Sequence, residues 1–308
     1  MTDFAGFDST GFAFAGFDEY TVPVTGGDLA VLRWPAAATG AETVLLVHGI
    51  TANALAWAGV VEAIDGRVNL IAPDLRGRAH SRTITGPWGI DADVDDLIAV
   101  LNHAGLERAT VVGHSLGGFV ACALARRSPD RVARVIAVDG GLGFPVPADI
   151  DPDLVLEAVV GPAIAKLTMT FDDVDDYLDF HRTHPSFIGN WTPQLTAYLY
   201  RDAITANDRI VSSCVEVAIR ADGRQVLVDE AVRDAIKSLD CPVTLLYAER
   251  GLRGEAQALY DGDRLALAAL DPARVRVHFV AGTNHYTIVA PGDGARAVAA
   301  EITAEITA

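Results

Sequence analysis

From Tyr20 onward the chain alternates short apolar runs with longer amphipathic segments. Two of the runs, Thr21–Val24 and Leu29–Trp34, flank a glycine-rich turn at Gly27 and therefore predict a β-hairpin. The later runs are so uniformly apolar that they suit strands covered on both faces of a sheet. They are Thr43–Val47, Asn69–Ala72, Thr110–Val112, Arg134–Val138, Val243–Tyr247 and Val275–Val280.

Helical patterns lie between these runs. Asp91–His103 places its apolar side chains at i, i+3, i+4 and i+7, and Leu116–Arg127 follows a predicted strand directly. Strands that alternate with helices in this way pack as a parallel sheet with helices on both faces. The sequence therefore predicts an α/β fold with a mostly parallel central sheet flanked by helices.

The strand pattern is interrupted between Gly140 and Asp240, where we expect helices alone. We predict that residues 1–143 and 239–308 form one core and that residues 144–238 form a helical cap, or lid, inserted into it. Residues 1–19, which are rich in Phe, are predicted to be an N-terminal arm. The helix start signals in the cap are Asp151 before Pro152, Thr170 with Asp173, Thr192 before Pro193, and Asp229.

Composition and charge exclude several classes of partner. Lys and Arg number 24 against 41 Asp and Glu, a net charge of −17 that disfavours nucleic acid and anionic membrane surfaces. The three Cys form no CxxC pair, and no GxGxxG motif or P-loop is present, so we expect neither a cofactor nor a metal. We expect no signal peptide and no membrane span, and hence a cytoplasmic protein; the expected partner is a small molecule. Whether the protein forms a homo-oligomer stays open.

The strongest local signal is the motif Gly113-His114-Ser115-Leu116-Gly117, which lies between a predicted strand and a predicted helix. In that context G-x-S-x-G forms a nucleophile elbow, a tight turn that projects the Ser hydroxyl from the sheet. A Ser hydroxyl is a weak nucleophile and needs a base within hydrogen-bond reach. The sequence therefore predicts Ser115 as a nucleophile, whereas the adjacent His114 is expected to point away and pack.

With this motif the chain resembles the α/β-hydrolase superfamily over roughly residues 20–300. Three further segments are similar to that family. Val44–Gly49 looks like its oxyanion loop, Ala72–Gly77 like its loop after the next strand, and Thr283–Tyr286 like the loop that carries its catalytic His. Ala79 departs from the family pattern, which often has Gly there, and so does Gly251, which stands at the family's usual acid position.

The remaining catalytic groups follow from chain order and from the resemblance. Among eight His, only His285 lies in a loop beyond the carboxyl end of a predicted strand, where ligands gather in such sheets. Asp139 ends a predicted strand, and we favour it as the acid that orients His285; Glu249, two residues before the usual position, is the alternative. The oxyanion donors are expected to be the backbone N–H groups of Leu116 and, by resemblance, Ile50.

The resemblance implies a cofactor-independent serine hydrolase acting on a small-to-medium, largely apolar carboxylic ester or lactone. C–C bond hydrolysis, amide hydrolysis, a lyase reaction and a ligand-binding receptor on the same scaffold remain alternatives. The apolar content of the cap predicts a largely apolar pocket. Its expected lining residues are Phe144, Met169, Phe171, Trp191 and Tyr198.

Overall fold

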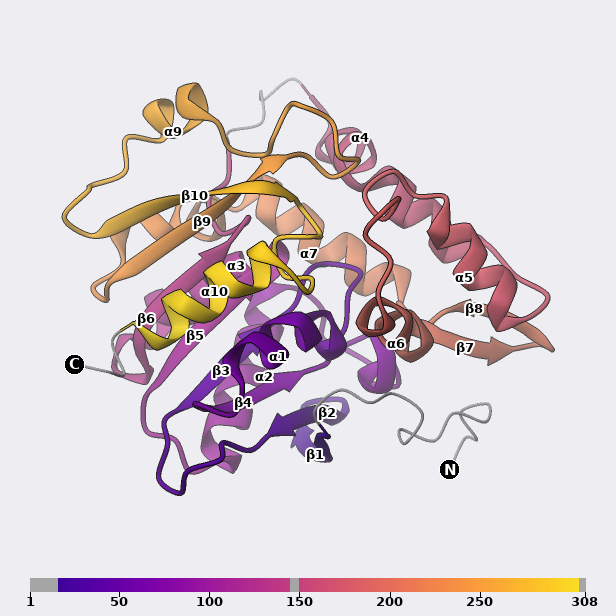
Figure 1. Ribbon diagram of the computed structural model, residues 1–308, viewed down its shortest axis with the longest axis horizontal. Coiled ribbons are helices and arrows are strands. Elements are labelled where there is room, and N and C mark those ends of the chain that lie inside the picture. Colours follow the sequence, from indigo (N-terminus) through magenta and orange to yellow (C-terminus); the bar gives the residue numbers. More distant parts are fainter. Residues whose placement is uncertain (1–15, 145–149, 305–308) are drawn as a thin grey trace.

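The computed structural model describes residues 16–144 and 150–304. Its core is an eight-stranded sheet in the order β1-β2-β4-β3-β5-β6-β9-β10 (Figure 1). The hairpin β1/β2 and the pair β2/β4 are antiparallel, and the other neighbours are parallel. The predicted fold class and all eight predicted strands are thereby confirmed. The strands are β1 Asp18–Val24, β2 Gly27–Trp34, β3 Thr43–Val47, β4 Asn69–Pro73, β5 Ala109–His114, β6 Val132–Val138, β9 Val243–Arg250 and β10 Val275–Asn284.

Helices cover both faces of the sheet. α1 (Ala58–Ile64) and α10 (Asp293–Thr303) bury one apolar cluster, and α2 (Ile90–His103) and α3 (Leu116–Arg127) bury another on the opposite face. Successive strand residues contribute to opposite clusters, since side chains alternate across a sheet. In β5, for example, Val111 packs into the second cluster and Val112 into the first. This double burial explains why the strands are continuous apolar runs.

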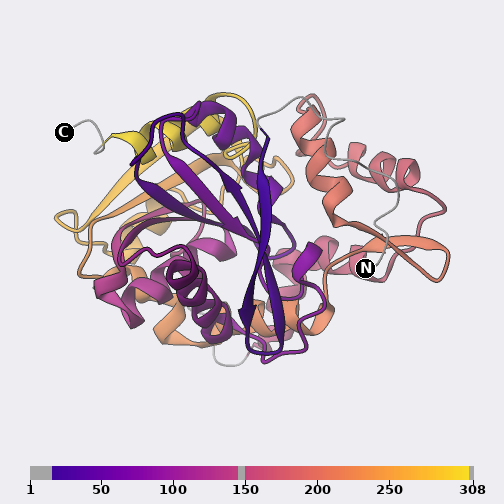
Figure 2. The ribbon, with the colours of Figure 1, turned by 90° about the horizontal axis from the view of Figure 1, so that it is seen from below.

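The segment between β6 and β9 forms a second layer beside the sheet (Figures 1 and 2). Some of its helices pack directly against helices of the core, and a small two-stranded sheet adjoins them. The elements are α4 Pro152–Ala165, α5 Val174–Arg182, α6 Pro193–Asp202, β7 Ala203–Ala206, β8 Arg209–Ser212, α7 Glu216–Val228 and α8 Glu230–Arg233; α9 (Gly262–Ala268) follows β9.

Three features of this segment differ from the sequence expectation. The β7/β8 hairpin was not predicted, although Asn207 and Asp208 form its turn with φ of 51° and 60°, a conformation that these residue types tolerate. Helix α7 was also missed. In addition, the side chain of Asp173, rather than that of Thr170, caps α5 by accepting from the amide of Asp176.

Most of the predicted N-terminal arm lies outside the described residues. Phe17, which is described, packs edge-to-face on Trp34 with ring centroids 5.9 Å apart. The next residues form β1 at one edge of the sheet. The arm therefore joins the body at the strand that carries Glu19.

Candidate active site

Ser115 lies on a strained turn between β5 and α3. Its φ of 54° and ψ of −121° belong to a region that non-glycine residues rarely adopt. The turn is tight on both sides: a Cβ on Gly113 would lie 2.0 Å from the carbonyl oxygen of Gly117, and one on Gly117 would lie 2.0 Å from that of Val47. Only glycine fits at these two positions, which is the geometry of a nucleophile elbow.

A buried His–Asp pair lies beside this turn. The Nδ1 atom of His285, after β10, lies 2.7 Å from the Oδ2 atom of Asp139, after β6. The Oδ1 atom of Asp139 accepts from the amide of Ala248 at 3.1 Å, and the side chain is fully buried. Glu249 is exposed and accepts from the amide of Gly282 at 2.7 Å. The structure thus pairs His285 with the favoured acid and not with the alternative.

His114 has a closer relation to this pair than the sequence suggested. Its Nε2 donates to the backbone carbonyl of His285 at 2.8 Å, and the two rings lie 4.8 Å apart. Burial, followed by the neighbouring His285, lowers the pKa of His114 to about 3. His114 therefore stays neutral, and its hydrogen bond holds the backbone carbonyl of His285. The expectation that it merely packs away from the site was wrong, because the loop after β10 brings His285 beside it.

The loop after β3 lies directly against Ser115. A Cβ on Gly49 would lie 3.3 Å from the Cβ of Ser115 and 3.7 Å from its Oγ. His48 accepts the amide of Leu75 at Nε2 and donates from Nδ1 to the Gly49 carbonyl at 2.8 Å. Because a trans peptide is planar, the amide of Ile50 points opposite to that held carbonyl. Within residues 16–144 and 150–304, the amides of Ile50 and Leu116 have no acceptor.

These groups open into one cavity of about 100 Å³ at the carboxyl ends of β5 and β10. Ser115 and His285 form part of its wall, and most of the remainder is apolar. Among the described residues, its lining includes no Lys, Arg, Asp or Glu side chain. The apolar residues that define its shape include Leu55, Phe187, Leu195, Tyr198, Leu252 and Val289.

Of the five predicted pocket residues, Tyr198 lines this cavity and four lie elsewhere. Phe144 packs on Tyr260, with the Arg264 guanidinium 5.5 Å above its ring, and Met169 is exposed. Phe171 and Trp191 belong to the small apolar core that α5 and α6 form between themselves.

Phe187 and Leu195 were missed. A cap needs apolar residues both for its own core and for the cavity, and the two sets are chemically alike. Only the Thr192–Pro193 start signal could have helped, since it fixes the phase of α6 on which Leu195 and Tyr198 share a face.

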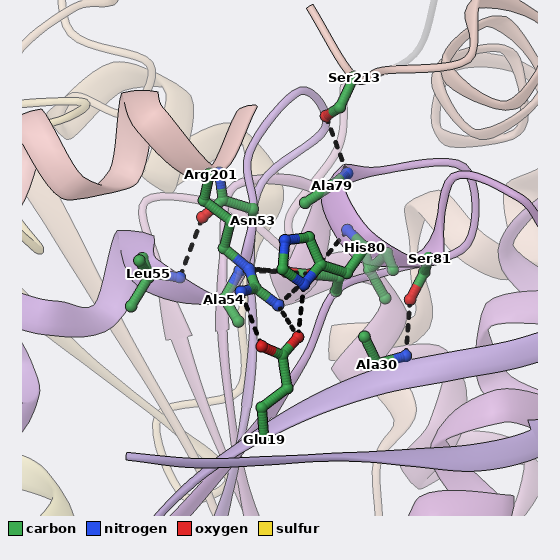
Figure 3. A network of polar contacts seen from close by, with 12 residues as sticks. Glu19, Ala30, Asn53, Ala54, Leu55, Ala79, His80, Ser81, Arg201 and Ser213 are labelled. Carbon is green, nitrogen blue, oxygen red and sulfur yellow. Dashed lines mark hydrogen bonds and ion pairs between the residues drawn. The ribbon is translucent and has the colours of Figure 1, made fainter. Parts of the chain in front are cut away.

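An ionic network fixes α6 to the core (Figure 3). Arg201, in α6, donates to both carboxylate oxygens of the buried Asp74 and to Glu19 in β1. Burial alone would raise the pKa of Glu19, but hydrogen bonds from His80 and Arg201 lower it to about 2. Glu19, Asp74 and His80 come close enough to share a metal ion. The Arg201 guanidinium bridges the two carboxylates and supplies the positive charge there instead.

Comparison with known proteins identifies the family. A family model described as alpha/beta hydrolase fold matches residues 42–286. The chain belongs to the α/β-hydrolase family. The chain is 36% identical to lipase LipV of Mycobacterium tuberculosis over 154 residues, which are 48% of this chain and 58% of the lipase. It is 30% identical to 2-hydroxymuconate semialdehyde hydrolase of Pseudomonas sp. over 215 residues, or 65% of this chain and 73% of that one.

Other relatives match the chain over 29–47% of their own length, so the chain spans less than half of these proteins. Among solved structures, E-2-(acetamidomethylene)succinate hydrolase superposes with a TM-score of 0.74 at 20% identity, covering 95% of this chain and all of that one. A thermophilic esterase from Thermogutta terrifontis gives 0.65 at 19% identity, covering 95% and 98%. At these identities the superpositions establish the fold alone. No helix in the described part of the chain has the length and apolarity to cross a membrane.

Proposed function

We propose that this protein is a cofactor-independent serine hydrolase that cleaves a small-to-medium, largely apolar carboxylic ester or lactone. The observation that carries the proposal is the strained Ser115 turn beside the buried Asp139–His285 pair, with both opening into the same apolar cavity. A nucleophile, a base and an orienting acid are the groups that acyl transfer through a serine needs.

In the proposed mechanism Ser115 attacks the substrate carbonyl while the Nε2 atom of His285 accepts the hydroxyl proton. Asp139 holds the proton of His285 on Nδ1 and stabilises the imidazolium that forms. The amides of Ile50 and Leu116 bind the oxyanion of the tetrahedral intermediate. The alcohol leaves with the proton from His285, and an acyl-enzyme remains. Water, deprotonated by His285, then attacks the acyl-enzyme, and the acid is released.

The cavity supports a neutral, short acyl group. No charged side chain from the described residues lines it, so a carboxylate on the substrate would find no ionic partner there. The volume of about 100 Å³ is comparable with the ~150 Å³ of an apolar cavity that accommodates benzene. A chain of a few carbons fits such a space, whereas a long acyl chain needs the cap to move.

A second candidate is hydrolysis of a C–C bond on the same three residues. It is favoured by the similarity to 2-hydroxymuconate semialdehyde hydrolase, which extends over 73% of that protein. Both reactions begin with a carbonyl in the same pocket, so the catalytic residues do not distinguish them. Assays of esters and diketones side by side, with an amide included, do distinguish them.

The test combines a covalent probe with a substrate series. A fluorophosphonate should label the protein once, and Ser115→Ala should remain unlabelled. Turnover of p-nitrophenyl esters should be highest for short acyl chains. Labelling that persists in Ser115→Ala would refute the nucleophile. Tight binding of esters without any turnover would instead indicate a receptor on a hydrolase scaffold.

A further inference from the structure

The backbone carbonyl of Ile50 is held by a buried arginine. Arg78, which follows β4 and is fully buried, donates from Nε to the Ile50 carbonyl at 3.0 Å. A second nitrogen donates to the carbonyl of Arg76 at 2.7 Å. The third pairs with Asp222 at 2.5 Å, and Asp222 belongs to α7 of the cap. A single guanidinium therefore connects a cap helix to Ile50, whose amide has no acceptor among the described residues.

The side chain of Ile50 is held by the cap as well. It packs against an apolar cluster that includes Leu156 of α4 and Ile219 of α7. A Cβ on Gly223, the residue after Asp222, would lie 3.3 Å from the Cδ1 atom of Ile50. The cap thus contacts Ile50 on its side chain and, through Arg78, on its carbonyl. Together with the Gly49 carbonyl, which His48 holds, these contacts fix both peptide planes of Ile50.

We propose that Arg78 and Asp222 are positioning residues, through which helix α7 holds the oxyanion-binding amide of Ile50 in place. This role rests on the proposed function, because it is the serine reaction that needs the amide. The cap accordingly takes part in catalysis as well as in selecting the substrate. Preorganised donors stabilise a developing oxyanion only when they are held in position before the reaction, so a loosened Ile50 would lower turnover more than substrate binding.

The charges around Arg78 identify Asp222 as the partner that matters. A second buried acid, Asp93 in α2, lies in the same region, and neither of its carboxyl oxygens has a partner among the described residues. Burial, followed by the nearby Asp222, raises the pKa of Asp93 well above its ordinary value. Asp222 accepts directly from Arg78, whereas neither carboxyl oxygen of Asp93 contacts a donor among the described residues, so Asp222 is the acid that anchors the Arg78 guanidinium. Asp93 offers a matched control for Asp222.

The first arm of the test replaces the pair by apolar residues of similar size. Buried ion pairs exchanged in this way commonly keep or gain stability, so Arg78→Met/Asp222→Leu should fold. We expect its kcat for a p-nitrophenyl ester to fall by about 10- to 100-fold, somewhat less than the ~10²–10³ for outright loss of an oxyanion donor. KM should change by less than about threefold, because the cavity wall is untouched.

The second arm compares single isosteric variants. Asp222→Asn should lower kcat because it leaves Arg78 without its charge partner, whereas Asp93→Asn should keep kcat at the wild-type value. A boronic acid, which forms a tetrahedral adduct with the serine, should lose affinity in proportion to kcat/KM in Asp222→Asn and in the double variant. A merely structural role would lower the melting temperature without this proportionality.

Three results are decisive. If the folded double variant and Asp222→Asn both retain kcat within about threefold of wild type, the positioning role is refuted while the proposed function stands. Equal loss of kcat in Asp93→Asn and Asp222→Asn also refutes the role, because it would reflect general damage to the core. If the wild-type protein neither reacts with a fluorophosphonate nor turns over any ester, the proposed function fails and the positioning role fails with it.

Discussion

The Nδ1 atom of His285 lies 2.7 Å from the Oδ2 atom of Asp139, although 146 residues of chain separate them. Asp139 has a φ of 45° directly after β6, and its second oxygen is occupied by the amide of Ala248. The carboxylate therefore has one free direction, and it points at the imidazole. Glu249, on the neighbouring strand, is oriented instead toward the β10 backbone.

Replacing Asp139 should lower kcat strongly and leave substrate binding nearly unchanged. Asp139→Asn keeps the shape but favours the wrong imidazole tautomer, so we expect kcat to fall by up to roughly 10⁴-fold with KM nearly unchanged. Glu249→Gln is the matched control and should stay within about threefold of wild type, because it removes only an exposed hydrogen bond. Steady-state kinetics on both variants suffice. If Glu249→Gln, and not Asp139→Asn, shows the large loss of kcat, the acid assignment is wrong.

The cavity lining predicts where acyl-chain preference can be altered. Leu195→Trp adds bulk to the wall of a cavity of about 100 Å³, so esters of longer acids should lose kcat/KM while acetate esters keep most of theirs. Met169→Trp changes an exposed cap residue that does not line this cavity, and it should leave the chain-length profile unaltered. A profile that shifts with Met169→Trp and not with Leu195→Trp would place the acyl pocket elsewhere.

The ionic network that attaches α6 to the core predicts that two arginines differ greatly in what they contribute to the free energy of unfolding. Arg201→Met leaves the buried Asp74 without its cation and should lower the free energy of unfolding by about 3–5 kcal/mol. Arg127, whose pair with Asp95 is exposed, is the control, and Arg127→Met should cost less than about 1 kcal/mol. Urea denaturation monitored by fluorescence measures both. Similar losses would mean that the buried network contributes no more than a surface pair.

The free energy of unfolding should begin to fall once the pH drops below the ordinary pKa of histidine. Burial, followed by the Lys166 ammonium, lowers the pKa of His181 to about 4 from 6.5. Between these values the unfolded chain binds a proton that the folded chain does not, so stability falls as the pH falls, by at most about 1.4 kcal/mol per pH unit for each such group. His181→Gln should flatten the slope of unfolding free energy between pH 6.5 and 4. An unaltered slope in His181→Gln would contradict the neutral, buried state of this imidazole.

The strands and the elbow were predictable because their signals are local. Leu116–Arg127 and Thr43–Val47 have the predicted bounds, since a strand buried on both faces has to be continuously apolar and a helix periodic. Asp139 was predictable because the sequence shows that it ends an apolar strand and that Gly140 and Gly141 follow it. The end of that strand lies at the carboxyl edge of the sheet. The order of strands then places it near His285.

The rest depended on contacts between segments that are remote in sequence. Nothing local distinguishes Phe171, which packs inside the cap, from Phe187, which lines the cavity. His114 acquires its role only when the loop after β10 arrives beside it. Likewise, Arg78 and Asp222 are 144 positions apart, and their pairing follows from how α7 lies on the core.

The contact between Glu19 and Arg201 links the edge strand β1 to helix α6, which lines the cavity. Arg201 lies in the last turn of the helix that carries Leu195 and Tyr198 into the cavity, and one of its anchors, Glu19, lies near the start of the numbering. A tag or truncation that stops before Phe17 leaves that anchor in place (Figure 3). A truncation that removes β1 detaches the outer side of Arg201 and lets α6 shift. We therefore expect a truncation that removes Glu19, unlike one that stops before Phe17, to alter the acyl-chain profile, and truncated forms should be assayed for it.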